Sequence, residues 1–335
     1  MTFIGMDHGT TGISFCVMSD DEEILDVFKI DREDSKSGKV SAIEELSKRC
    51  NLESVKLMAI TYAMGDGFNR ILPIDKVEDR GILSIEGAGK VTGGGTSVFS
   101  ELESSNIPTI MIPGLHKNST SLNELFNAAY SHQASPEKVS ISYNALKETG
   151  WKNFIVADIS SNSVDILIED SRIKGAIDAC IGAMGIVHGP IDLEMIRDID
   201  EGRKTANECF SHAGAIKIAG IDGKVANMKD QLLENYVNGD EKAKLAIDTL
   251  IMTVAMEIAG LDIVCENDIE GIVLTGSIGS ATVPFNFEDE INKYFKGKYE
   301  LKAISKESGA IGAAQIAHDV YNGEKEILGI EADLS

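Results

Sequence analysis

The sequence has few basic residues and no long apolar stretch. Its 335 residues include 31 Lys and Arg against 54 Asp and Glu, which gives a net charge of −23. Nucleic acids are bound through clustered basic side chains, so this balance argues against a nucleic-acid partner. No run of about 18 apolar residues occurs, which argues against a membrane-spanning helix. We expect an acidic, solvated surface and a cytoplasmic protein without a membrane partner.

Cysteine is sparse and scattered. The five cysteines never form a CxxC pair, so we expect no zinc or iron–sulfur cassette within one chain. This usage also fits a reducing compartment better than a secreted protein. The first residues lack a basic segment followed by a long apolar stretch, and we therefore expect no signal peptide.

What the sequence does contain is a repeated order of short strands. Three strands are indicated at 2–7, 13–19 and 23–30, then a helix at 40–50 and a buried strand at 55–63. Three strands recur at 152–160, 164–170 and 172–180. Each first strand ends on an acid, Asp7 or Asp158, followed by a turn of small residues. This favours an internal duplication; the alternative is two unrelated β-meanders.

Helix start signals occur between and after these strands. Ser121 precedes Glu124 by three residues, which predicts a capping box. Ser135 and Pro136 predict a helix start, and that helix should stop at Gly150. Further helices are expected at 240–264 and at the small-residue segment 309–320. The length suits two domains, and we expect them at 1–150 with the C-terminal helix 309–323, and at 151–308.

The turn after the first strand, "MDHGTTG", has the composition of a phosphate cradle. Gly9 permits unusual backbone angles, and the hydroxyls of Thr10 and Thr11 can bond phosphate oxygens. Asp7, at the strand end, is placed to hold Mg²⁺ through water. A hairpin turn without a ligand is the alternative interpretation.

The second turn, "ADISSNS", is a weaker version of the first. Asp158 repeats Asp7, and Ser160 and Ser161 offer hydroxyls where glycines might be expected. Their side chains narrow the approach of the backbone to an anion. A turn without a ligand is therefore almost as well supported here as a phosphate loop.

Two further segments are rich in small residues. "TGSIG", with Gly276, Ser277 and Gly279, follows a buried strand, and ligands tend to bind beyond the carboxyl ends of such strands. We expect a small-residue turn there that leaves room for a base and ribose. Gly309 begins a helix whose small residues permit close packing, with or without a ligand.

Together these elements resemble the acetate and sugar kinase, heat-shock 70 and actin superfamily. The resemblance spans nearly the whole chain and implies an α/β, duplicated actin-like (ribonuclease H-like) two-domain ATPase fold with a nucleotide cleft between the domains. It implies ATP and Mg²⁺ as cofactors, with Asp7 and Asp158 as catalytic and metal-binding residues close to one another. It assigns Gly9, Thr10, Thr11, Ser160, Ser161, Gly276, Ser277, Gly279 and Gly309 to the nucleotide.

The acetate and butyrate kinases are the most similar branch, through "GAGKVTGGGT", the helix at 240–260 and "GIVLTGSIG". More narrowly, the sequence resembles the methanogenesis marker protein 12 family of methane-producing archaea. It departs from the acyl kinases at three places. The acyl kinases have an amide residue where this chain has Asp7, and a histidine where it has Asp158. Their loop that corresponds to residues 185–192 contains an arginine, which this chain lacks. In that loop only His188 is a candidate cation, so acyl phosphorylation carries over poorly.

The substrate side rests on three residues and leaves two functions open. Glu86 and Lys90 lie in a glycine-rich segment, and His188 replaces the missing cation. One reading is an ATP-dependent phosphotransferase that acts on a small anionic molecule. The other is an ATP-binding accessory or assembly protein of a methanogenic system, with a partner protein and little kinase activity. By analogy with acyl kinases, a homodimer is expected.

Overall fold

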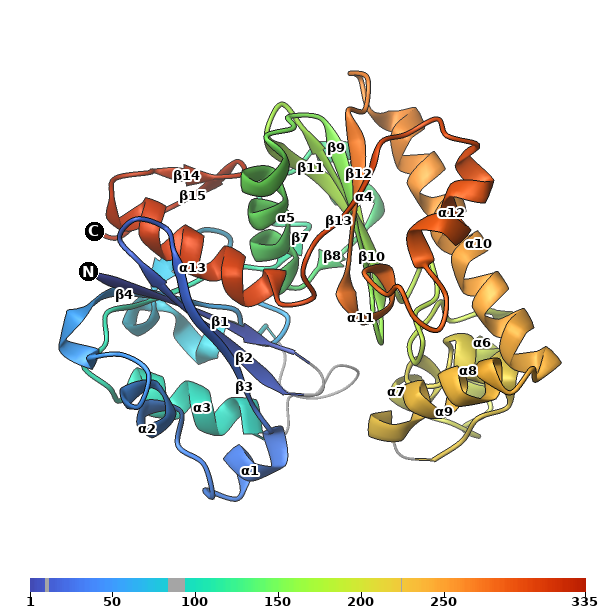
Figure 1. Ribbon diagram of the computed structural model, residues 1–335, viewed down its shortest axis with the longest axis horizontal. Helices are drawn as coiled ribbons and strands as arrows, with labels where there is room; N and C mark the ends of the chain where they lie inside the picture. The colour runs from blue at the N-terminus through green and yellow to red at the C-terminus, as the bar shows by residue number, and fades with distance from the viewer. Residues whose placement is uncertain (10–11, 84–93, 224) are drawn as a thin grey trace. The chain divides into compact units, whose positions relative to one another are not determined.

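The structure is a computed structural model that describes residues 1–9, 12–83, 94–223 and 225–335. The chain divides into two units (Figure 1). Unit 1 contains Met1–Gly150, Ser171–Gly175 and Glu307–Ser335, and unit 2 contains Trp151–Asp170 and Ala176–Lys306. Within the described residues, no helix is both long and apolar enough to cross a membrane.

Unit 1 is built on a six-stranded sheet in the order β3-β2-β1-β4-β6-β5. The strands are β1 (Thr2–His8), β2 (Ile13–Ser19), β3 (Ile24–Ile30), β4 (Val55–Ile60), β5 (Leu72–Pro73) and β6 (Thr109–Met111). β1 runs antiparallel to β2 and parallel to β4. The helices are α1 (Arg32–Lys36), α2 (Ala42–Ser47), α3 (Gly94–Glu103), α4 (Glu124–Ala129), α5 (Pro136–Thr149) and α13 (Ser308–Tyr321). Two short ribbons, β7 (Leu115–His116) with β8 (His132–Ala134) and β14 (Glu326–Ile327) with β15 (Ile330–Glu331), complete it.

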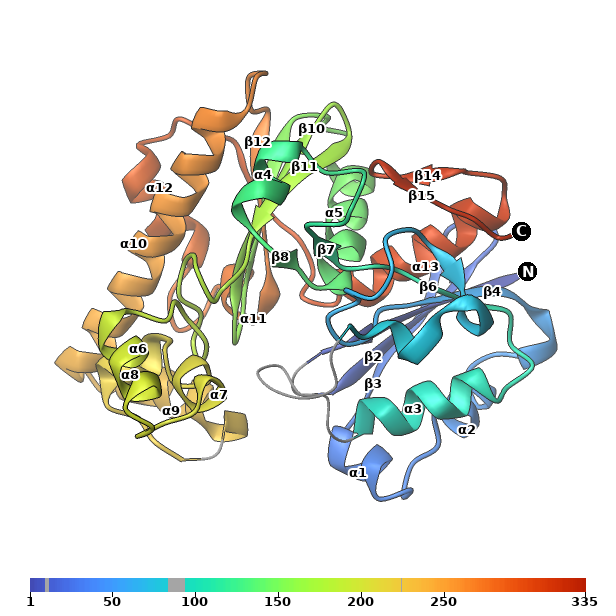
Figure 2. The ribbon, with the colours of Figure 1, turned by 180° about the vertical axis from the view of Figure 1, so that it is seen from behind.

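The two faces of the β1–β3 sheet are covered differently. α2 and α3 lie on one face and α13 lies on the other, as Figure 2 shows from behind. Ile4, Met6 and Phe15 pack with α3 residues in the main core. On the opposite face, α13 comes so close to β1 that a Cβ on Gly5 would lie 2.0 Å from the Ala310 carbonyl oxygen. Because side chains alternate along a strand, successive residues of β1 face these two different environments.

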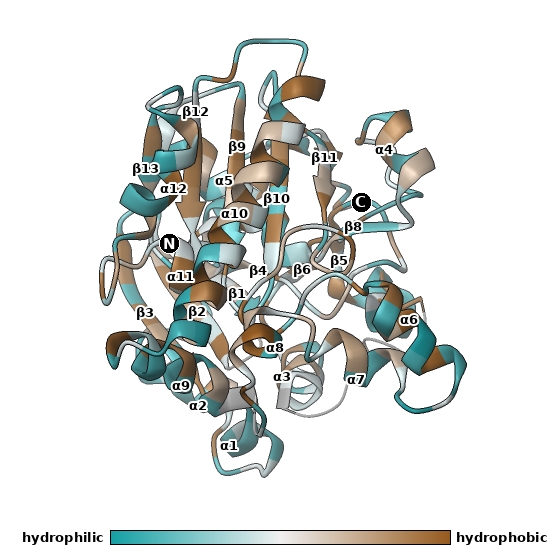
Figure 3. Ribbon diagram, turned by 90° about the vertical axis from the view of Figure 1, so that its right-hand side faces the viewer, coloured by the Kyte–Doolittle hydropathy of each residue, from teal (hydrophilic) through white to brown (hydrophobic). Residues whose placement is uncertain are grey.

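Most of a five-stranded sheet in the order β11-β10-β9-β12-β13 belongs to unit 2, and residues 172–175 of β11 are counted in unit 1. The strands are β9 (Phe154–Ile159), β10 (Ser163–Glu169), β11 (Arg172–Ile177), β12 (Gly271–Thr275) and β13 (Leu301–Ala303). The helices of unit 2 are α6 (Leu193–Asp200), α7 (Ala206–Phe210), α8 (Ala215–Ala219), α9 (Val225–Val237), α10 (Glu241–Val264), α11 (Gly276–Gly279) and α12 (Phe287–Phe295). β9 and β12 are mostly hydrophobic in Figure 3, as expected for buried parallel strands.

The duplication is visible in the strand orders. In both sheets the first three strands of the unit form a meander, and the next strand pairs parallel with the first: β4 with β1, and β12 with β9. This confirms the predicted repeat. The strand assignments at 2–7 and 13–19 are confirmed, and the strand predicted at 55–63 is present but ends at Ile60.

Two local predictions are wrong. The N-cap of α4 is Asn123, whose side-chain oxygen accepts the Leu125 N–H at 2.9 Å, and Ser121 is not the cap. An asparagine directly before the helix reaches the second free N–H, so the earlier serine is not needed. "TGSIG" forms the short helix α11 rather than a turn, with Gly276 at φ +86°. The start of α5 at Pro136 and its end at Gly150, with φ +69°, are confirmed.

Candidate functional site

The first predicted loop begins where β1 ends. Asp7 pairs with Ser14 of β2, and its Oδ1 accepts a hydrogen bond from Thr61 Oγ1 at 3.2 Å. Gly309, in the first turn of α13, covers this carboxylate, because a Cβ on Gly309 would lie 2.8 Å from Asp7 Cγ and Oδ2. Gly9 follows the strand; Thr10 and Thr11 lie outside the described residues.

His8, the next residue on β1, lies on the opposite face. Its Nε2 is contacted by the Arg32 guanidinium, and its ring centroid lies 5.1 Å from that of Tyr62. A Cβ on Gly95 of α3 would collide with the imidazole. Burial and the neighbouring Arg32 lower the pKa of His8 to about 4, so the ring is neutral at pH 7. The prediction missed this group because Arg32 is far from the loop in sequence.

The second loop follows β9 and packs against the first residues of α11. Asp158 is only 6% exposed. A Cβ on Gly276 would lie 2.3 Å from Asp158 Oδ1 and 2.6 Å from Ser160 Oγ. Ser160 Oγ accepts the Ser277 N–H at 2.9 Å, which still leaves the hydroxyl proton to donate. Gly279 packs against the Ile159 side chain.

The segment that contains His188 is attached to this second loop. The N–H groups of Val187 and His188 donate to the Ser161 carbonyl at 3.0 Å each, and that of Ile186 donates to the Ser160 carbonyl. Burial lowers the pKa of His188, and its ring lies 4.7 Å from that of Phe210. A neutral imidazole is therefore favoured at pH 7, so this histidine is a poor substitute for the missing arginine. Within the described residues its Nδ1 is buried without a hydrogen-bond partner.

Two buried carboxyl groups lie behind the second loop. Asp165 of β10 is fully buried, and Glu257 of α10 is 9% exposed. Glu257 Oε2 accepts the Ala183 N–H at 2.5 Å, which ties α10 to the segment that leads to His188. Burial raises the pKa of Glu257 to about 8, and burial next to Glu257 raises that of Asp165. The pair therefore holds protons that isolated carboxyls would release.

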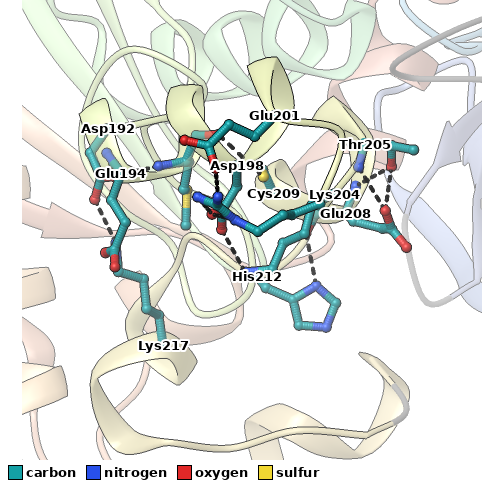
Figure 4. A network of polar contacts seen from close by, with 12 residues as sticks. Asp192, Glu194, Asp198, Glu201, Lys204, Thr205, Glu208, Cys209, His212 and Lys217 are labelled. Atoms are coloured by element: carbon teal, nitrogen blue, oxygen red, sulfur yellow. Dashed lines mark hydrogen bonds and ion pairs between the residues drawn. The ribbon is translucent and has the colours of Figure 1, made fainter.

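A separate cavity of about 440 Å³ lies in the helical part of unit 2. Figure 4 shows part of the polar network around it, in which Lys217 reaches Asp192 and Lys204 reaches Asp198. Arg203 also pairs with Asp198, and Thr205 caps α7 by accepting the Glu208 N–H at 3.1 Å. The lysines of the cavity are thus already neutralised by acids. None of the predicted site residues lines this cavity.

The structure thus brings the predicted residues into two groups. In unit 2, Asp158, Ser160, Ser161, His188, Gly276 and Ser277 form one cluster. In unit 1, Gly309 lies directly over Asp7, while Glu86 and Lys90 lie outside the described residues. Carboxylate and hydroxyl oxygens are ligands that suit Mg²⁺ and its bound waters, so the donor set fits this metal. The closeness of Asp7 to Asp158 stays a prediction.

Comparison with protein-family models finds no match. The chain is 58% identical over 334 residues to a UPF0285 protein of Methanothermobacter thermautotrophicus, which covers 100% of this chain and 99% of that protein. It is 50% identical over 333 residues to a UPF0285 protein of Methanocaldococcus jannaschii, covering 99% of each. Both relatives come from methanogens.

Solved kinase structures share the fold. A propionate kinase from Francisella tularensis superposes with a TM-score of 0.66 at 14% identity, over 95% of this chain and 99% of the kinase. An acetate kinase from Porphyromonas gingivalis gives 0.64 at 12% identity, with the same coverage. A glucokinase of the ROK family from Streptomyces griseus gives 0.53 at 15% identity, over 95% of this chain and 100% of that kinase. At such identities the likeness concerns the fold alone, and it confirms the two-domain actin-like fold.

Proposed function

The chain belongs to the UPF0285 family, and from its kinase-like fold and its loop chemistry we propose that it binds ATP with Mg²⁺ and transfers a phosphoryl group to a small anionic molecule. The kinases that share the fold support ATP and a divalent metal. The fold does not identify the molecule that accepts the phosphoryl group, because one fold serves many reactions.

One observation carries the proposal: the cluster of Asp158, Ser160, Gly276 and Ser277 at the carboxyl ends of β9 and β12. These neighbouring strands run parallel, with Thr275 paired to Asp158. Ligands of α/β sheets bind beyond such strand ends. A buried acid, a serine hydroxyl and backbone N–H groups of small residues are the groups that a metal-bound phosphate chain requires.

In this proposal the chain's residues have separate tasks. Asp7 and Asp158 hold the waters of the metal and orient the attacking hydroxyl or water. Gly9, Thr10, Thr11, Ser160 and Ser161 belong to the phosphate loops, Gly309 belongs to the small-residue helix that contributes to the nucleotide site, and Gly276, Ser277 and Gly279 lie beside the adenosine. Mg²⁺, when bound, neutralises the charge that develops on the transferred phosphoryl group. Glu86, Lys90 and His188 are the proposed acceptor side, and a homodimer is the expected assembly.

A second function is favoured by one specific observation. The 185–192 segment has no arginine, and burial lowers the pKa of its histidine, so this segment offers no cation at neutral pH. Phosphoryl transfer depends on positive charge near the leaving and attacking oxygens. This lack favours an ATP-binding accessory or assembly protein with slow or no transfer.

Nucleotide binding is tested first. We expect calorimetry with millimolar ATP and Mg²⁺ to detect binding to the wild-type chain. ATP at 100 times its Kd should raise the free energy of unfolding by about 2.7 kcal/mol. Asp158→Asn should weaken the Mg²⁺ dependence of binding, whereas Asp170→Asn, which changes an exposed acid of the same unit, should not. Absence of both heat and thermal shift in the wild type would exclude both proposed functions.

Turnover then separates the two functions. Phosphate release or phosphoryl transfer from ATP is measured with and without a metabolite extract from a methanogen. Stimulation by the small-molecule fraction supports the phosphotransferase. Binding without stimulation supports the accessory protein.

A further inference from the structure

Two arginines of unit 1 stand out in this acidic protein. The chain has 54 acidic and 31 basic residues, and other arginines of this unit, such as Arg49 and Arg70, form ion pairs. Among the described residues, no carboxylate lies within ion-pair distance of Arg32 or Arg80. In a protein with excess carboxylate, two guanidinium groups without an acid partner are unexpected.

Both guanidinium groups belong to one side-chain group around the end of β1. Arg32 contacts His8 Nε2, and its own Nε is buried without a hydrogen-bond partner among the described residues. Arg80 Nη1 donates to Tyr62 Oη at 3.4 Å, and Tyr62 Oη lies 3.0 Å from Thr96 Oγ1 at the start of α3. The rings of His8 and Tyr62, tilted by 34° with centroids 5.1 Å apart, connect the two arginines into one group.

The neighbouring residues do not neutralise this charge. His8 contacts Arg32 through Nε2, and an imidazole carries no negative charge, so this contact does not compensate the guanidinium. The acid that acts on His8 through its charge, Glu137, is already paired with Lys138 Nζ at 3.0 Å and with the Ser135 hydroxyl at 2.7 Å. Burial lowers the pKa of Arg32, because it disfavours the charged guanidinium. A partly buried cation without a partner is costly, and an anion removes that cost.

We propose that Arg32, Arg80 and Tyr62 form a binding site for the oxyanion of a small molecule, a carboxylate or a phosphate. Guanidinium groups bind both anions through paired N–H donors, and the tyrosine hydroxyl supplies a further donor. The site lies on the face of β1 opposite Asp7, because consecutive side chains of a strand point to opposite faces. In the proposed phosphotransferase it holds the acceptor, and only this use rests on that function; anion binding itself does not.

Anion binding is therefore measured without nucleotide. The intact protein is titrated with inorganic phosphate, with acetate and with succinate, against chloride at equal ionic strength, by calorimetry and thermal unfolding. We expect saturable binding of at least one of these anions. A response to phosphate alone, or to acetate or succinate alone, shows whether the site binds phosphate or carboxylate. Wild-type protein that shows no saturable response to any of the three overturns the proposal, whatever the ATP titration gives.

Variants locate the site. Arg32→Gln and Arg80→Gln should each raise the Kd of the responding anion by tenfold or more. Arg70→Gln is the matched control, since Arg70 is partnered by Asp333 at 3.3 Å in the same unit, and it should leave the Kd unchanged. An equal effect of Arg70→Gln and Arg32→Gln would show a nonspecific charge effect and refute the site.

The anion-free state provides a second readout. Arg32→Gln removes an uncompensated charge, so it should leave the anion-free protein as stable as the wild type or more stable. Should Arg32→Gln fail to fold, Arg32→Lys and Arg80→Gln decide, because the first keeps the charge but loses the paired donors. Unchanged anion affinity in both of them contradicts the proposal.

Discussion

Asp7 and Asp158 end equivalent strands of two similar sheets, and each lies under a glycine, but their surroundings differ. Gly309 of α13 covers Asp7, and Gly276 of α11 covers Asp158. Around the end of β1 the additional groups are cationic or neutral, with Arg32 and His8. Behind β9 they are the buried acids Asp165 and Glu257.

The difference shows which part of a duplication is retained. Strand order and the acid near the strand end are common to both sheets. The charges behind those acids are not, and they determine what each loop can bind. The two loops therefore have a similar backbone but different neighbours. The loop after β1 lies near guanidinium groups without an acid partner among the described residues, and the loop after β9 lies near carboxyl groups that keep their protons.

The largest effect is expected where the covering glycine has no freedom to change. Gly276 has φ +86°, and an added Cβ would lie 2.4 Å from the Ile159 carbonyl oxygen. The left-handed conformation costs an alanine about 1–2 kcal/mol, and overpacking adds about 1–3 kcal/mol. Gly276→Ala should thus lower the free energy of unfolding by about 4 kcal/mol, as measured by urea denaturation. If Gly276→Ala lowers the free energy of unfolding no more than Gly309→Ala does, the glycines that cover Asp158 and Asp7 are equivalent.

The buried acids of unit 2 should make stability depend on pH. The pKa of Glu257 is raised from 4.5 to about 8 in the folded protein, so the folded state binds more protons than the unfolded state between these values. Stability therefore falls as pH rises from about 5 to 8, by on the order of 3 kcal/mol for this group. Glu257→Gln should remove the part of this slope that Glu257 contributes, since an amide keeps the hydrogen bond to Ala183 without titrating; Asp165, whose pKa burial also raises, keeps its own part.

Urea denaturation at several pH values measures the difference between Glu257→Gln and wild type. The control is Glu241→Gln, which changes an exposed acid at the start of the same helix. Parallel pH profiles for wild type and Glu257→Gln would contradict the raised pKa of Glu257.

The metal role of Asp7 is expected to appear in turnover rather than in stability. An acid that holds metal-bound water typically contributes about 10- to 100-fold to activity. Asp7→Asn should lower Mg²⁺-dependent turnover by up to this factor at equal nucleotide occupancy, and leave adenosine affinity largely intact. If Asp7 only caps its turn, asparagine replaces it without loss. Equal rates for Asp7→Asn and wild type would exclude the metal role.

The sequence contained enough to predict the frame. Alternating apolar strands, the two terminal acids and the small residues of "TGSIG" follow local rules, and the repeat predicted that a three-strand meander would recur in the second half. The prediction of Ser121 as a cap failed because two polar residues compete within one turn, and Asn123 lies nearer the helix. Such competition is resolved by the geometry of the chain and not by residue type.

The surroundings of the acids could not be predicted in the same way. Arg32 reaches His8 across 24 positions through the β3–α1 turn, and no spacing rule connects them. Asp165 did leave a signal, since it interrupts the apolar strand "VDILIE", and Glu257 similarly lies between the apolar residues of α10. An acid inside a buried pattern points to a protonated or paired carboxyl.

The smallest expected effect concerns the cover of Asp7. Gly309 is helical and an added Cβ would lie 2.8 Å from the Asp7 carboxyl group, which is a side chain and can move. Alanine gains up to about 1 kcal/mol in helix propensity over glycine, which offsets part of the crowding. We expect Gly309→Ala to change the free energy of unfolding by no more than about 1 kcal/mol. The displaced Asp7 should nevertheless bind Mg²⁺ more weakly in the presence of ATP. Gly260→Ala, whose Cβ meets open space on α10, gives the propensity gain alone and serves as control. A Gly309→Ala variant with the stability gain of Gly260→Ala and unchanged Mg²⁺ dependence would show that Asp7 does not need its glycine, and the likeness between the two strand ends would then be one of backbone only.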